Sequence, residues 1–163
     1  MASTYEKIAT TTLGSASATV TFSSISGAYT DLVAICNFGG ASANEDFTIR
    51  FNGDTGSNYS FTNLRGNGST AASSRSSNAT RIVADLAGVS SSLQAIDTVQ
   101  IMNYSNTTTY KTALVRANDA SKSAEATVGL WRNTAAITSI DLAMTGGNLL
   151  SGSTFTLYGI LKA

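Results

Sequence analysis

Short blocks in which apolar and polar residues alternate recur along most of this chain, separated by glycine, serine and asparagine. In one such block Phe47, Ile49 and Phe51 fall on one side, and Thr48 and Arg50 fall on the other. A period of two is the spacing of side chains on one face of a β-strand, whereas an α-helix repeats about every 3.6 residues. We therefore expect a chain built mainly of half-buried strands.

Roughly nine to eleven such blocks, about ten residues apart, favour two sheets that bury their apolar faces against each other. The sequence predicts an all-β, single-domain antiparallel β-sandwich over residues 1–163, of the jelly-roll type. The first three blocks are expected to be successive strands of one antiparallel sheet: ATVTFSS, DLVAICNF and DFTIRFN. Further strands are expected in IDTVQIMNY, YKTALVRAND, ATVGLWRN, ITSIDLAMT and STFTLYGIL.

At most one short helix is expected. Its best candidate is the segment RIVADLAGVSSSLQ, in which Ile82, Leu86 and Val89 would share a helical face and Gly88 would form a break or cap. Residues 66–80, GNGSTAASSRSSNAT, contain no aliphatic side chain larger than alanine. We expect them to form an exposed polar loop within the same domain.

Charge and composition exclude several classes of partner. Ten basic and ten acidic residues give a formal net charge of zero, which argues against nucleic-acid binding and against a polybasic membrane anchor. No segment reaches the length of a transmembrane helix, and we expect no secretory signal. Only 12% of the residues are charged, so the polar surface must consist largely of serine, threonine and asparagine.

The chain lacks several of the residue types that catalytic sites commonly use. The chain has no histidine and a single cysteine, Cys36, which lies in an apolar run and is expected to be a small buried hydrophobe. Zinc is therefore not expected, and no cofactor or other metal site is predicted. The acidic residues are scattered singly except for Glu45 and Asp46, which would point to opposite faces of a strand. The sequence thus predicts a protein that is not an enzyme.

The stretch FNGDTGSNYSF, residues 51–61, resembles a calcium or phosphate loop at first sight. It has only one charged residue, Asp54, and no lysine, so it lacks what either ligand requires. Asn52 and Gly53 tolerate the positive φ of tight turns. The stretch is therefore expected to turn the chain between strands.

Five aromatic residues fall near strand ends or loops: Tyr59, Phe61, Tyr104, Tyr110 and Trp131. Aromatic rings can stack on sugars, but in most sandwiches they pack in the core, and we favour the core. In the alternative interpretation, Tyr59 and Trp131 contact a glycan.

Three segments resemble small structural proteins of tailed-bacteriophage particles, of the cyanophage and marine-phage type. They are TYEKIATTTLGSASATVTFSSISGAYTDLV, FNGDTGSNYS followed by RGNGS, and GSTFTLYGI. The resemblance spans nearly the whole chain. It implies a jelly-roll module that forms trimers or similar assemblies on the particle. Proteins of this type serve as capsid decoration or cement proteins, as head fibres, or as parts of tail fibres.

Among these roles we favour a decoration protein on the outside of the capsid, because the chain is compact and shows neither a fibrous stalk nor a catalytic body. Its expected partners are the major capsid protein and copies of itself, as a homotrimer. The alternative is a tail-fibre or head-fibre module that recognises a host surface glycan. Residues 1–12 are expected to form an N-terminal arm that contacts a partner subunit, with Tyr5 and Lys7 as candidate contacts.

Overall fold

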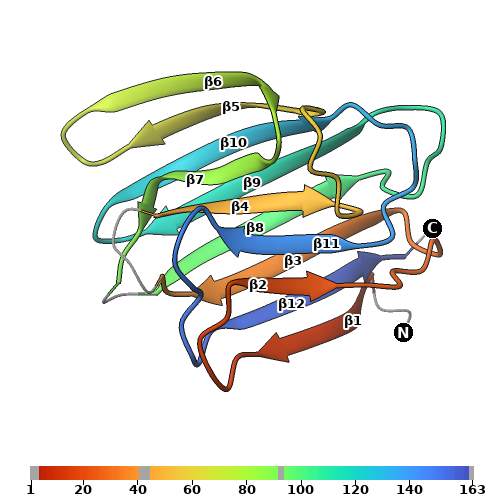
Figure 1. Cartoon of the computed structure of the whole chain (residues 1–163), viewed down its shortest axis with the longest axis horizontal. Coiled ribbons are helices and arrows are strands. Elements are labelled where there is room, and N and C mark those ends of the chain that lie inside the picture. The colour runs from red at the N-terminus through yellow and green to blue at the C-terminus, as the bar shows by residue number, and fades with distance from the viewer. Residues whose placement is uncertain (1–3, 41–44, 92–93, 162–163) are drawn as a thin grey trace.

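The computed structural model describes residues 4–40, 45–91 and 94–161, and these residues form twelve β-strands and no helix. They are arranged in an eight-stranded and a four-stranded sheet that lie face to face (Figure 1). The strands are β1 (Tyr5–Thr12), β2 (Thr19–Phe22), β3 (Asp31–Phe38), β4 (Glu45–Phe51), β5 (Tyr59–Gly66), β6 (Ala71–Ala79), β7 (Ile82–Val89), β8 (Ala95–Met102), β9 (Lys111–Asp119), β10 (Ser123–Trp131), β11 (Ile140–Met144) and β12 (Thr154–Ile160). The predicted all-β antiparallel sandwich is confirmed.

Strands that are far apart in the sequence pair with each other in both sheets. β1 pairs with β12 and β3 with β8 in the large sheet, while β2 pairs with β11 and β4 with β7 in the small sheet. This order is compatible with the predicted jelly roll. Two hairpins, β5–β6 and β9–β10, widen the large sheet to the order β1-β12-β3-β8-β9-β10-β5-β6. In Figure 1, β5 and β6 lie beyond the edge of the small sheet.

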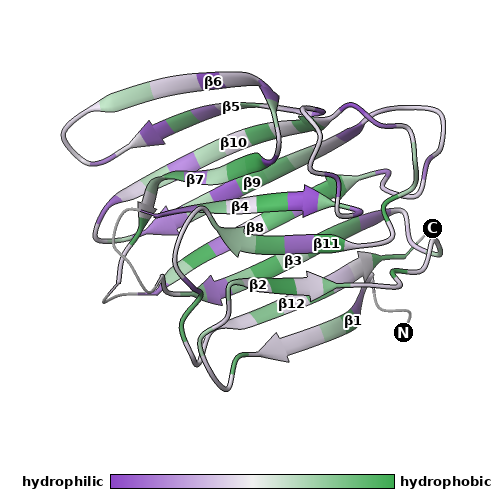
Figure 2. Ribbon diagram, viewed as in Figure 1, coloured by the Kyte–Doolittle hydropathy of each residue, from purple (hydrophilic) through white to green (hydrophobic). Residues whose placement is uncertain are grey.

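The core lies between the sheets and is built from the inward positions of the alternating strands (Figure 2). Phe38 of β3 meets Phe47 of β4 with ring centroids 4.2 Å apart, which joins the two sheets, and Phe155 of β12 lies 5.9 Å from Phe38. All three rings are fully buried, and burial of each contributes roughly 1.5–3 kcal/mol. Cys36 is also fully buried, as predicted, and burial raises the pKa of its thiol well above the ordinary value.

The expectation that the first three blocks form neighbouring strands of one sheet is wrong. β2 and β4 belong to the small sheet and β3 to the large sheet, so each connection crosses the sandwich. Alternation specifies which face of a strand is buried, but it carries no information about the strand on either side.

The predicted short helix is also wrong, because Ile82–Val89 is strand β7. Its pairing with β4 contains two register shifts, and the extra residues lie in β7. The inserted residues break the period of two, so that Ile82 and Val89 are buried at a spacing that suggests a helix. Gly88 has a φ of 74°, which a residue with a side chain rarely adopts.

Residues 66–80 are exposed almost throughout, as predicted, but they are not a loop. A turn follows Gly66, in which Asn67 Oδ1 accepts the backbone N–H of Thr70 at 2.8 Å, and strand β6 then pairs with β5. β6 buries neither face, so its side chains carry no apolar period. Only the backbone hydrogen bonds to β5 define it as a strand.

Part of the predicted N-terminal arm, residues 1–3, lies outside the described residues. From Tyr5 onward the segment is not a free arm, because β1 pairs with β12 along the edge of the large sheet. Backbone pairing of the first and last strands thus determines the position of this segment.

Candidate interaction surface

The turn at residues 51–54 has the conformation that its sequence predicts. Asn52 and Gly53 have φ values of 53° and 64°, and the N–H of Asp54 donates to the carbonyl of Phe51 at 3.0 Å. Positive φ at both central residues is the signature of a type I′ turn. The stretch carries the chain from β4 in the small sheet to β5 in the large sheet.

The carboxylate of Asp54 is occupied by contacts within the protein. It accepts hydrogen bonds from Trp131 Nε1 at 2.7 Å, from the Gly56 N–H at 2.8 Å and from Asn58 Nδ2 at 2.9 Å. Partial burial opposes ionisation of this carboxyl, but the three donors outweigh it and hold its pKa below the ordinary value. Asp54 therefore fixes the turn onto β10 instead of binding a ligand.

Replacing Asp54 with alanine should lower the free energy of unfolding by about 2–3 kcal/mol at neutral pH, because three hydrogen bonds to a charged group are lost. Because the folded pKa is lowered, this stabilisation is present above pH 3.8 and is lost as the pH falls through the folded value. Urea denaturation at neutral and acidic pH measures both effects. Thr55→Ala, at an exposed position next to Asp54, is the control, and an equal loss in both variants would contradict this role.

The two aromatic residues of the glycan alternative lie in the interior. Tyr59 and Trp131 are 0% and 1% exposed, and their rings stack with centroids 6.3 Å apart. The Tyr59 hydroxyl donates to the carbonyl of Asp54 at 3.2 Å, and burial raises its pKa to about 12. A sugar cannot stack on a ring that the protein already covers, so the assignment of these two residues to glycan contact is corrected to the core.

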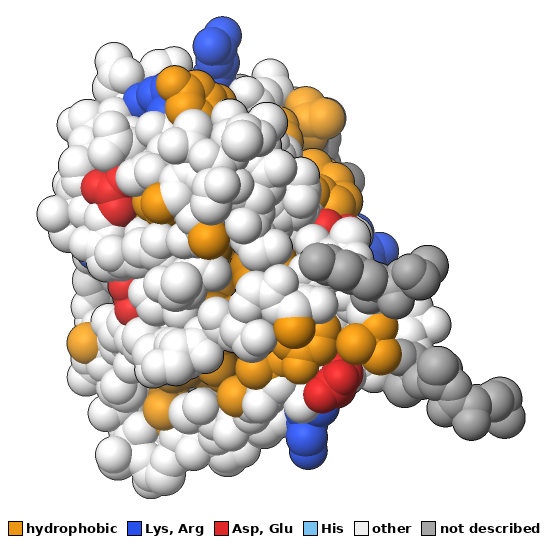
Figure 3. Space-filling view, turned by 90° about the vertical axis from the view of Figure 1, so that its right-hand side faces the viewer, with side chains coloured by type: hydrophobic (Ala, Val, Ile, Leu, Met, Phe, Trp, Pro, Cys, Tyr) orange, Lys and Arg blue, Asp and Glu red, His pale blue; other side chains and the backbone are white. Residues whose placement is uncertain are grey.

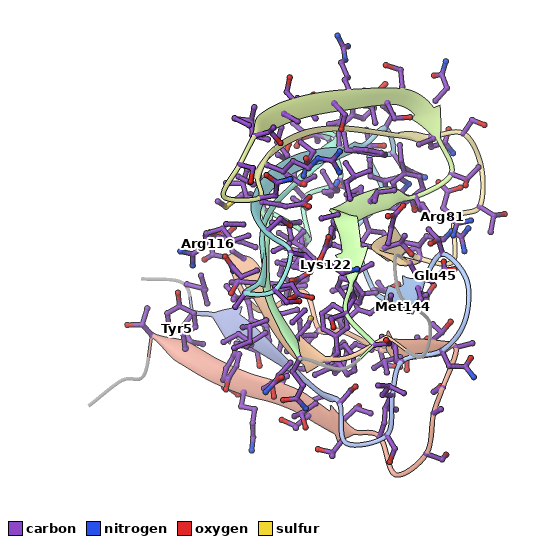
Figure 4. All side chains as sticks on the ribbon, turned by 90° about the vertical axis from the view of Figure 1, so that its left-hand side faces the viewer. Tyr5, Glu45, Arg81, Arg116, Lys122 and Met144 are labelled. Carbon is purple, nitrogen blue, oxygen red and sulfur yellow. The ribbon has the colours of Figure 1, made fainter. Side chains whose placement is uncertain are left out.

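Tyr5 and Lys7 lie on strand β1 at the edge of the large sheet. The side chain of Tyr5 is 52% exposed and meets Tyr158 of β12 edge-on, with ring centroids 6.4 Å apart. Figure 4 shows Tyr5 projecting from the same side of the molecule as Arg116, away from the small sheet. The partner contact predicted for Tyr5 and Lys7 therefore stays a prediction, at an exposed position.

The outer face of the large sheet, which turns away from the small sheet, exposes large apolar side chains. Leu114 of β9 and Val128 of β10 are direct cross-strand partners and are 44% and 45% exposed. Ile35, Leu64 and Ile96 on neighbouring strands are 42%, 61% and 52% exposed. A shallow groove of about 440 Å³ runs over this face, lined by Thr62, Leu64, Thr98, Gln100, Leu114, Val115, Arg116, Ala126, Thr127 and Val128.

The central strands of this outer face carry few charges, and Arg75 of β6 and Lys7 of β1 lie toward its edges. Among the outward positions of β8, β9 and β10, Arg116 is the one charged residue; the others are Ile96, Thr98, Gln100, Met102, Thr112, Leu114, Asn118, Ala124, Ala126, Val128 and Leu130. Charged side chains are also sparse on the end of the sandwich seen in Figure 3. Apolar patches with few charges are typical of surfaces that bind another protein.

The structure brings together four acidic residues that sequence reasoning treated as scattered. They lie buried on four different strands: Asp85, Asp97, Asp119 and Glu125. Asp97 could have been found from the alternation, since it shares a face with Val99 and Ile101. No three His, Cys, Asp or Glu side chains within the described ranges are grouped so that they could hold a metal ion.

No protein-family model and no curated protein matches this chain. Within residues 4–40, 45–91 and 94–161 there is no helix long and apolar enough to cross a membrane.

Proposed function

We propose that this chain is a structural protein of a bacteriophage particle, a capsid decoration or cement protein that binds the outer surface of the shell. The outer face of the large sheet carries the proposal. It presents apolar side chains at Leu114, Val128 and Leu64, with Arg116 and Arg75 as charged neighbours, so that docking would remove apolar area from water and require an acceptor for each guanidinium.

The size of this face suits a stable contact. The large sheet has eight strands, each of seven to nine residues. With about 4.8 Å between strands and about 3.3 Å per residue, the face covers roughly 900 Å². A standard protein interface buries about 800 Å² on each partner. The expected occupant is a capsid subunit that offers an apolar surface and oxygen acceptors for the guanidinium groups of Arg116 and Arg75.

Copies of the same chain are the second expected partner, as a homotrimer. Tyr5 and Lys7 support this proposal, because they lie on the edge strand β1, at the margin of the outer face, where a neighbouring subunit can reach them. The sequence segments that resemble phage structural proteins include this strand and β12, with which it pairs.

The copy number of the chain in purified particles tests the proposal. Quantitative mass spectrometry against the major capsid protein should give a ratio near one if the protein covers the shell. A few to a few dozen copies per particle would move the protein to the tail or to a vertex fibre. Absence of the chain from washed particles would overturn a structural role altogether.

A further inference from the structure

Four acidic side chains, here called the carboxyl cluster, lie buried between the two sheets. Each comes from a different strand, and their exposed fractions are 1% for Asp85, 0% for Asp97, 1% for Asp119 and 5% for Glu125. Burial of a carboxylate is costly unless hydrogen bonds or a cation compensate for the lost water, or unless the group stays protonated. The four carboxyls of this cluster differ in their hydrogen bonds and in the shift of their pKa.

Pairing in the large sheet brings two members of the cluster into one row. Asp97 of β8 and Glu125 of β10 both lie opposite Ala117 of β9, on the inner face. Ala117, which lies between the two carboxyls, has only a methyl side chain. Asp85 comes from β7, and the charges of Glu125 and Asp119 both act on it.

Two members of the cluster bind the backbone of the segment that includes the second half of β7. Glu125 accepts the N–H groups of Leu86 at 2.9 Å and Ala87 at 2.7 Å. Asp119 accepts the N–H of Ser90, just beyond β7, at 2.9 Å. These side chains of the large sheet replace ladder hydrogen bonds that β7 lacks, since its pairing with β4 is interrupted twice.

The first half of β7 is held differently. Ile82 packs directly on Gly129 of β10, where an added Cβ would lie 2.6 Å from its side chain. The two halves of β7 are therefore held by different interactions. Pairing with β4, the packing of Ile82 on Gly129 and a hydrogen bond from Thr127 Oγ1 to the carbonyl of Ala84 at 3.1 Å hold the first half, whereas the carboxyl cluster binds the backbone N–H groups of the second.

Asp97 makes no hydrogen bond of normal geometry in this arrangement, although the N–H of Asn118 lies near its carboxyl. Both of its carboxyl oxygens are buried and unpaired, and its cross-strand neighbour is the buried Cys36. Burial, and after it the charge of Asp85, raises the pKa of Asp97 well above the ordinary value; the nearby N–H of Asn118 only moderates the shift. Burial without a compensating cation thus favours the protonated form of Asp97.

Asp85 lies close to its point of ionisation at neutral pH. Burial, together with the charge of Glu125, raises its pKa from 3.8 to about 7, although the N–H groups of Ala87 and Gly88 donate to its carboxyl. Ionisation of Asp85 places a negative charge beside Glu125 and Asp119 in a region of low dielectric constant.

We propose that the carboxyl cluster is a proton-dependent attachment of β7 to the large sheet. While Asp85 and Asp97 are protonated, residues 85–90 stay bound to Glu125 and Asp119. Loss of these protons creates like charges beneath the strand and releases its second half. This inference stands apart from the proposed role in a phage particle.

Other ionisable groups lie close to the carboxyl cluster and affect its net charge. Asp46 on β4 is a further acid near the cluster, and burial and the charge of Glu125 raise its pKa. Hydrogen bonds from Ser121 and Ser90, with the charge of Lys122, outweigh burial and lower the pKa of Asp119. The cations and the thiol near the cluster are Lys122, whose Nζ donates to Val89 O at 3.3 Å, Arg65, whose guanidinium donates to Leu86 O at 3.0 Å, and the neutral Cys36.

The direction of the pH effect follows from the raised pKa of Asp85. The folded state binds this proton more tightly than the unfolded chain does, so the stabilisation is complete below pH 3.8 and is lost as the pH rises through about 7. The raised pKa of Asp97 acts in the same direction. From about pH 5 to about pH 9, we expect the opening equilibrium of residues 85–90 to increase roughly 100-fold.

Hydrogen exchange measures this opening directly. Protection of the Leu86, Ala87 and Ser90 amides, corrected for intrinsic exchange rates, should fall roughly 100-fold over that range in the intact chain. The double variant Asp85→Asn, Asp97→Asn cannot ionise at these positions and should keep its protection constant. Asp141→Asn, on the small sheet away from the cluster, should behave as the unmodified chain does; its acceptor for the Thr21 hydroxyl is retained.

Two results would overturn the inference: constant protection of these amides in the unmodified chain, or an unchanged pH dependence in the double variant. If the double variant does not fold, Asp85→Asn alone gives the same comparison with a smaller expected change. Protection at about pH 9 should also be the same with millimolar Ca²⁺ as with EDTA. Restoration by Ca²⁺ would identify a cation site and contradict the proton-dependent attachment.

Discussion

Replacing Leu114 with lysine together with Val128 with glutamate should weaken binding to capsid shells at least about 100-fold, or roughly 3 kcal/mol. Both side chains lie on the outer face that we propose to dock, and a partner would have to desolvate the new charges. The two residues are direct cross-strand partners, so the opposite charges pair and the fold should lose less than about 1 kcal/mol. Cosedimentation with stripped shells measures the affinity, and urea denaturation measures the stability.

The small sheet offers a matched control for this experiment. Thr19 of β2 and Ala143 of β11 are also cross-strand partners, and Thr19→Lys with Ala143→Glu introduces the same pair of charges on the opposite face of the sandwich. This variant should bind shells as the unmodified protein does. Loss of binding in the control, with binding intact in the Leu114 and Val128 variant, would show that the small sheet is the docking face.

Replacing Trp131 with alanine should lower the free energy of unfolding by about 3–5 kcal/mol, through the cavity that it leaves. The indole packs against Phe51 with ring centroids 5.7 Å apart and against Tyr59, and its loss also removes a donor from Asp54. Thermal or urea denaturation measures the change.

Tyr110→Ala is the control for this prediction, because the Tyr110 side chain is 53% exposed and its removal should cost less than about 1 kcal/mol. A glycan array carried out on the same two variants separates stability from recognition. Unchanged stability of Trp131→Ala with loss of glycan binding would contradict the buried role of Trp131 and restore the host-recognition alternative.

Burial of a single face separates the strands that the sequence predicts from β6 and β7, which it does not predict. β4, β8 and β10 each bury one face, so their side chains alternate and the sequence predicts them. β6 buries neither face, and β7 carries extra residues that interrupt the alternation. In β6 and β7 backbone hydrogen bonds determine the conformation, and these leave little trace in the order of side chains. β1 and β5 are also not predicted as strands, although β5 alternates between buried and more exposed side chains from Tyr59 to Leu64.

The outer face of the large sheet can be predicted from local sequence patterns, whereas the carboxyl cluster cannot. Leu114 and Arg116 occupy outward positions of a recognised strand, so their exposure follows from the alternation once the inner face is known. The cluster depends on the crossing of β7 over β10, which no local pattern contains. The alternation in the sequence places Asp97 and Glu125 at inward positions, but it does not predict that these residues lie close together in the fold.

Pairing of the first and last strands brings the two ends of the described chain together. The N–H of Leu161 donates to the carbonyl of Thr4 at 3.1 Å, and both ends lie on one side of the sandwich in Figure 1. A short linker could therefore join the ends, and new ends could be opened in the exposed turn between β5 and β6. Such a circular permutant would keep every strand pairing of the native sandwich and present a fused cargo at the opposite corner of the large sheet.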